Sequence, residues 1–200
     1  ISGENNIIVA SVDALMTYTA DRQKFENGVI SFSLSEVYNI KDITEKLVDI
    51  GYKREDMIEG PGQFSLRGGI LDIYSPNNEN PVRIEFWDDE IDSIRTFDVD
   101  SQRAIENIES VRVIPVSEAL YSQKRKDEIV LELTRRLKNS ENEATADYVK
   151  SLKSDIEMFN ESVRFPSVDK YVSLIYGFIP SLLDYFTEDD TVFVADPKRI

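Results

Sequence analysis

Apolar residues recur at helical spacing in one short segment of the chain. Asn39 precedes this segment and can cap a helix, because its side-chain oxygen accepts hydrogen bonds from the free N–H groups of the first turn. Gly51 follows it and suits the C-terminal stop. We therefore predict an amphipathic helix that buries Ile40, Ile43, Leu47 and Ile50.

Between residues 57 and 99 the period changes to strict alternation, which is typical of half-buried strands. Turn residues at 60–62, 75–78 and 88–90 separate the strands, so we predict an antiparallel meander. The alternation assigns one face to Phe64, Leu66, Val82, Ile84 and Phe86. It assigns the opposite face to Gln63, Ser65, Arg67, Arg83, Glu85 and Trp87.

The flanking segments predict a second unit. Residues 7–12 form an apolar run typical of a strand in a parallel sheet, with Asp13 as the cap of a helix that continues to about Tyr18. Two further strands are expected at 29–34 and 110–115.

Helices are predicted around residues 129–137 and 148–159, with a polar break at 139–143. A shorter helix is expected at 168–175, another from Pro180, and a buried strand at 191–195. Together these elements predict a mixed fold, in which a partial α/β domain is interrupted by a small α+β domain.

Composition narrows the range of chemistry. The chain has 23 Lys and Arg against 38 Asp and Glu, a formal charge of -15 that repels nucleic-acid phosphates. Cysteine and histidine are absent, which excludes disulfides, thiolate metal sites and histidine bases. With no long apolar run or signal-like start, we expect a cytoplasmic protein with no membrane partner. The start at Ile1 and the stop just after an apparent strand suggest a segment of a longer polypeptide.

Two loops resemble chemical sites but have simpler explanations. Residues 60–62 lack the Lys-Ser or Lys-Thr of a phosphate-binding loop and are better explained as a turn. The acidic cluster of Asp88, Asp89, Glu90 and Asp92 fits a solvated hairpin turn, with metal binding as the alternative.

The outward trio of Arg67, Arg83 and Trp87 is the stronger candidate site. Exposed Trp and Arg are frequent interface hot spots, because an indole offers broad apolar area and a guanidinium offers a rigid set of donors. The alternative is that the arginines pair locally with Glu85 or Asp72 while Trp87 packs against a neighbouring element.

Residues 51–74, GYKREDMIEGPGQFSLRGGILDIY, and 83–95, RIEFWDDEIDSIR, resemble a signature shared by transcription-repair coupling factors and UvrB. The segments 7–12 and 182–186 resemble the flanking helicase-like domain of those proteins. The coupling-factor family fits better, because 13–16 and 194–197 depart from the DNA-gripping and ATP-hydrolysing segments of UvrB.

The resemblance implies a UvrA-interaction insert at 37–116 within a partial helicase-like (RecA-like) α/β domain formed by 1–36 and 117–200. It implies that Arg67, Arg83 and Trp87 contact UvrA, although the family usually has phenylalanine at the third position. Catalysis is not expected from this segment. ATP, magnesium, RNA polymerase and DNA would be bound by other parts of the longer protein.

Three alternatives stay open at this point: a UvrB-like excision-repair helicase fragment that contacts DNA directly, a metal-dependent phosphodiesterase using Asp88, Asp89 and Asp92, and a purely structural role.

Overall fold

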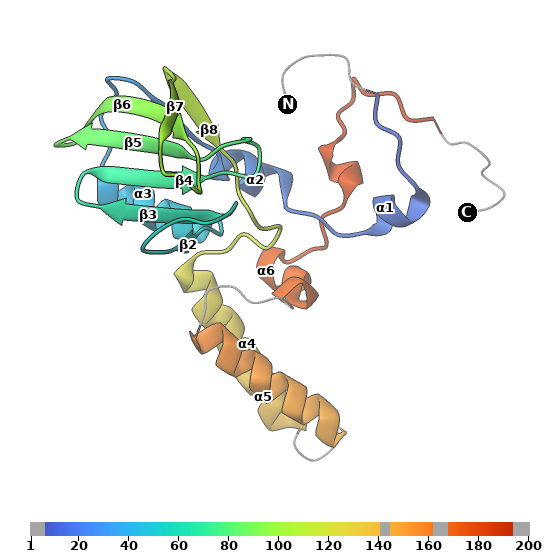
Figure 1. Cartoon of the computed structure of the whole chain (residues 1–200). Coiled ribbons are helices and arrows are strands. Elements are labelled where there is room, and N and C mark those ends of the chain that lie inside the picture. The colour runs from blue at the N-terminus through green and yellow to red at the C-terminus, as the bar shows by residue number, and fades with distance from the viewer. Residues whose placement is uncertain (1–6, 141–144, 162–167, 194–200) are drawn as a thin grey trace.

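A computed structural model describes residues 7–140, 145–161 and 168–193. Its central feature is a six-stranded sheet (Figure 1). Neighbouring strands are antiparallel except β2 and β3, which are parallel. In sheet order the strands are β2 (Lys53–Arg54), β3 (Gln63–Arg67), β4 (Ile70–Tyr74), β5 (Val82–Trp87), β6 (Glu90–Phe97) and β7 (Ala104–Asn107). The predicted meander is therefore confirmed as β3 to β6.

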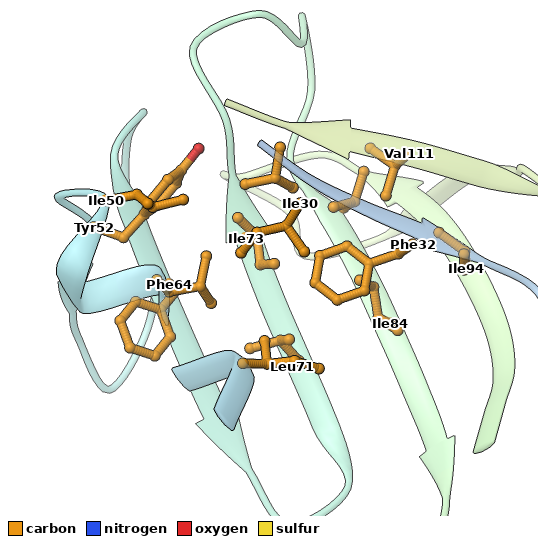
Figure 2. Close-up of a cluster of buried hydrophobic side chains, with 14 of the residues drawn as sticks. Ile30, Phe32, Ile50, Tyr52, Phe64, Leu71, Ile73, Ile84, Ile94 and Val111 are labelled. Carbon is orange, nitrogen blue, oxygen red and sulfur yellow. The ribbon is translucent and has the colours of Figure 1, made fainter. Parts of the chain in front are cut away.

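One face of the sheet packs against α3 (Ile40–Asp49) and against a two-stranded ribbon of β1 (Ile30–Ser33) and β8 (Ser110–Val113). Figure 2 shows Phe32 from β1 and Val111 from β8 facing Ile84 and Ile94 of the sheet. The first hydrophobic core forms here because the alternating strands bring most of their buried apolar side chains to this one face.

Helix α3 has the ends that its sequence predicts. The side-chain oxygen of Asn39 accepts hydrogen bonds from the backbone N–H groups of Lys41 and Asp42, at 3.0 and 3.1 Å. Gly51 follows the helix with φ of 107°, a left-handed conformation that favours glycine. The helix buries Ile43 and Leu47 against the sheet.

A second core lies among the C-terminal helices, which leave the sheet as a long arm (Figure 1). Its largest fully buried side chains are Phe159 and Leu133. The helices of this core are α4 (Gln123–Ser140), α5 (Ala146–Glu161), the 3-10 helix η1 (Val168–Tyr171) and α6 (Val172–Tyr176). A further 3-10 helix, η2 (Leu182–Tyr185), lies against α1 (Val12–Met16) instead (Figure 1). The predicted helices are thus confirmed, although α4 continues to Ser140 and residues 141–143 of the predicted break lie outside the described residues.

The outer edge of β6 is shared by two different segments. Strand β7 pairs with one end of β6, at Arg95 to Phe97. At the other end, the segment 35–38 lies alongside residues 89–91 and forms an isolated bridge between Val37 and Glu90. This second pairing brings a residue from before α3 to the turn between β5 and β6.

The predicted strand at residues 7–12 is wrong. Ile7 is 94% exposed, the segment is not a strand, and the following helix α1 (Val12–Met16) is capped by Ser11 rather than by Asp13. A strand needs a neighbour for its backbone hydrogen bonds, and none of the described strands lies beside this run.

Residues 191–193 are likewise not a strand, and 194–195 lie outside the described residues. The fold is therefore α+β with a mixed sheet plus helices. Three short elements were not anticipated, namely α2 (Arg22–Gly28), β2 and β7.

Candidate protein-docking face

The face of the sheet opposite the first core carries a row of polar side chains. Backbone pairing places Ser65 opposite Asp72, Asp72 opposite Arg83, and Arg83 opposite Arg95, so one side chain from each of four strands stands in line. Directly paired residues point to the same face of a sheet. The order of these strands therefore builds the row from residues far apart in sequence.

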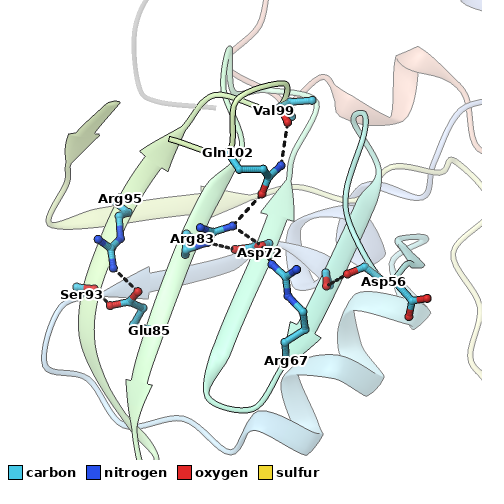
Figure 3. Close-up of polar contacts among 10 residues, drawn as sticks. Asp56, Arg67, Asp72, Arg83, Glu85, Ser93, Arg95, Val99 and Gln102 are labelled. Carbon is cyan, nitrogen blue, oxygen red and sulfur yellow. Dashed lines mark hydrogen bonds and ion pairs between the residues drawn. The ribbon is translucent and has the colours of Figure 1, made fainter. Parts of the chain in front are cut away.

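Asp72 links the two arginines of the predicted trio (Figure 3). Its carboxylate is 2% exposed and accepts hydrogen bonds from Nε and Nη2 of Arg83, at 2.7 and 2.9 Å, and from Nη2 of Arg67, at 2.9 Å. A buried carboxylate is stable when cationic donors surround it in this way. The structure thus brings Arg67 and Arg83 together on one shared acceptor.

The two arginines are held to different degrees. Arg83 also donates to the Gln102 side-chain oxygen at 3.1 Å, and its guanidinium lies 4.5 Å from the centre of the Phe97 ring. Its side chain is 19% exposed, whereas that of Arg67 is 50% exposed. The hydrogen bonds with Asp72 raise the pKa of Arg83 above its ordinary value, so this guanidinium stays charged. Arg83 is mainly a fixed part of the network, and Arg67 extends toward solvent.

The network leaves positive charge on this face. One carboxylate, Asp72, faces two guanidiniums, so one positive charge is not compensated within the group. Glu85 forms an ion pair with Arg95 and accepts a hydrogen bond from Ser93 at 3.0 Å. The charges of Glu85 and Arg95 cancel, so this pair adds no net charge. The excess positive charge of the Arg67–Asp72–Arg83 group favours an acidic partner group at this point of the face.

Trp87 lies at the end of β5, four residues beyond Arg83, and is 81% exposed. It follows Phe86, which packs against the first core, and therefore points to the opposite face with the arginines. The β3–β4 turn lies beside this end of β5, where Phe86 N–H donates to the Gly69 carbonyl at 2.8 Å. A Cβ at Gly69 would lie 2.9 Å from the Phe86 carbonyl oxygen, so this close approach requires glycine.

The positions of the trio agree with the alternation, and both arginines also make the local pair with Asp72 that was the alternative interpretation. Their role as partner contacts stays a prediction. Sequence reasoning did not identify Gln102, whose side chain bridges Arg83 and the Val99 carbonyl, or Val37 beside the β5–β6 turn. Val37 reaches the site through a strand pairing and Gln102 through a loop, and neither arrangement leaves a pattern in the neighbouring sequence.

Other regions give weaker candidates. Among the described residues, no group of three or more acidic side chains is placed to hold a metal ion, and no helix is long and apolar enough to cross a membrane. A cleft of about 580 Å³ is lined by residues of α2, α3, α4 and α6. Its Lys24 lies 4.4 Å from the centre of the Tyr176 ring, and its Arg125 donates to the carbonyls of Leu174 and Ile175, so these cations support the fold.

Comparison with known proteins relates the sheet to a protein family. Residues 30–118 match the family model of the UvrB interaction domain. The matched residues contain the whole six-stranded sheet and the polar row described above.

Over nearly its full length the chain is similar to transcription-repair-coupling factors. It is 34% identical to that of Bacillus subtilis over 200 residues, which cover 98% of this chain. It is 31% identical to those of two Staphylococcus aureus strains over 206 residues, covering 99% of this chain. The chain spans about 17% of the length of these relatives. The resemblance to coupling factors is thus confirmed.

Proposed function

We propose that this chain is the protein-docking segment of a transcription-coupled DNA-repair factor, and that it recruits UvrA through Arg67, Arg83 and Trp87. The observation that carries the proposal is the shared face of the sheet. An exposed indole and a half-exposed guanidinium stand there together, inside the segment that matches the UvrB interaction domain.

Arg67 is suited to a direct contact with the partner. Asp72 engages its Nη2, and a guanidinium has five N–H donors in a planar fork, so donors are left for a carboxylate of UvrA. Because Asp72 already fixes the orientation of the side chain, less rotamer entropy is lost on binding. Arg67 therefore sets the position of the acidic partner group.

Trp87 supplies apolar contact area beside that charge. An indole that is 81% exposed loses unfavourable contact with water when a partner covers it. Arg83 acts mainly by holding Asp72, and through Asp72 it holds Arg67. The mechanism is recognition, and this segment performs no catalysis.

In the longer protein, we propose that other parts bind RNA polymerase and DNA and use ATP with magnesium to drive translocation. Such a role places the protein in the cytoplasm with the chromosome. This segment would then bring UvrA to a stalled polymerase.

The test measures the affinity of purified UvrA for the native chain and for the variants Arg67→Ala and Trp87→Ala. Each variant should weaken binding by at least about tenfold, the loss expected at a hot spot. Arg136→Ala is the matched control for Arg67, because its side chain is 46% exposed and ion-paired on the distant helix α4.

Ile105→Ala, on β7, is the matched control for Trp87. Both controls should bind like the native chain. Native affinity in folded Arg67→Ala and Trp87→Ala proteins would reject this face as the UvrA contact.

A further inference from the structure

The exposed side chains near Trp87 include a residue from another part of the chain. Val37 precedes α3 and is 70% exposed, although it lies in an ordered extended segment. Single exposed apolar side chains are common, whereas exposed apolar side chains grouped on one face and rimmed by polar residues are typical of partner surfaces.

Backbone pairing places Val37 in line with Trp87. Trp87 is paired with Glu90 across the β5–β6 turn, and Glu90 is paired on its other side with Val37. Directly paired residues share a face, so all three side chains emerge on the face that carries Arg67.

The Val37–Glu90 pair has the closer of the two antiparallel geometries. Tyr38 N–H donates to the Asp89 carbonyl at 2.8 Å, and Ile91 N–H donates to the Glu36 carbonyl at 3.0 Å. These bonds flank the pair on both sides, which makes it a non-hydrogen-bonded pair with a Cα separation of about 4.5 Å. Val37 therefore lies two strand spacings, about 10 Å, from Trp87.

The segment that carries Val37 is fixed in place. Ser35 N–H donates to the Ile91 carbonyl at 3.0 Å, and the Tyr38 ring lies 5.3 Å from the ring of buried Phe32. A side chain held by its backbone in this way can be covered by a partner with little loss of conformational freedom.

We propose that the docking face continues past Glu90 to Val37, so that apolar side chains of the partner cover Trp87 and Val37 together. Glu90, between the two, is then matched by a cation or an N–H donor of the partner. The complementary surface on UvrA thus carries a carboxylate for Arg67, an apolar ridge for Trp87 and Val37, and a basic or amide group for Glu90.

This inference rests on the proposed function, and it is tested with the same UvrA binding measurement. Val37→Ser removes apolar area from a mostly exposed side chain and should weaken binding by about fivefold or more. Val37→Thr keeps the branched shape that suits a strand, and it should weaken binding less but in the same direction.

Ile105→Ser is the matched control, because Ile105 is an apolar residue, 54% exposed, on the other segment that pairs with β6. It should bind UvrA like the native chain. Circular dichroism and urea unfolding establish that each variant is folded.

The possible results separate the two proposals. Weaker binding by the Val37 variants, with a silent Ile105→Ser, supports the extended face. If Arg67→Ala and Trp87→Ala weaken binding while both Val37 variants bind like the native chain, the extension is overturned and the docking function stands. If none of these variants weakens binding, both proposals are rejected.

Discussion

The change of Asp72 to asparagine tests the polar network most directly. The substitution keeps the size of the side chain and removes its charge. Asp72 is 2% exposed and is the shared acceptor for three hydrogen bonds from Arg83 and Arg67. The Asp72→Asn protein therefore retains two guanidiniums without their carboxylate.

The expected magnitude follows from the exposure of each arginine. Removing one partner of a buried ion pair typically costs about 3–5 kcal/mol, because a charge is left without compensation. Arg83 keeps some contact with water at 19% exposure, which favours the lower end, about 3 kcal/mol. Arg67 is 50% exposed and can be solvated, so its share should be under about 1 kcal/mol. The free energy of unfolding should therefore fall by about 3 kcal/mol.

Urea unfolding followed by circular dichroism measures this change, since the slope reports whether the folded state stays compact. Two double-mutant cycles separate the contributions of the two arginines to this loss of stability. One combines Asp72→Asn with Arg83→Met, and the other combines Asp72→Asn with Arg67→Ala. The coupling energy should be about 2 kcal/mol or more for Arg83 and under about 1 kcal/mol for Arg67. A loss below about 1 kcal/mol for Asp72→Asn, or stronger coupling to Arg67, would refute this account of the network.

Two further predictions concern the fold that carries the face. Asn39→Ala removes the cap of α3 and should lower the free energy of unfolding by about 1 kcal/mol in urea, whereas Asn39→Asp should retain stability. Burial raises the pKa of Tyr52 from 10.0 to about 12, so the unfolded chain releases this proton first and the fold loses stability as pH rises from 10 toward 12. Tyr52→Phe should flatten this part of the pH dependence in urea unfolding, and an unchanged slope would contradict the assignment.

Much of the sheet was predictable because its information is local. Alternation along β3 and β5 is read within six residues, and it places Phe64 and Ile84 in the core and Arg83 on the other face. The cap of α3 is equally local, since Asn39 bonds to residues two and three positions ahead. These features need no knowledge of the rest of the chain.

The predictions were wrong where the structure of a segment depends on which other strand lies beside it. Residues 7–12 have the composition of a buried strand, but composition cannot supply the neighbouring strands that such a segment requires. The short strands β2 and β7 are exposed along their length, so their sequences lack the alternation of apolar and polar residues that marks a half-buried strand. Val37 belongs to the face only because β6 bridges it to Trp87, fifty residues later in the chain.

The separation of the two hydrophobic cores has an evolutionary consequence. The sheet, α3 and the β1–β8 ribbon share a core whose members run from Ile30 to Leu120, and the helical arm has a core of its own. A module with its own interior can be joined to different neighbours without rebuilding its packing. The sheet and its polar face can then be inherited as one unit while the segments joined to it diverge.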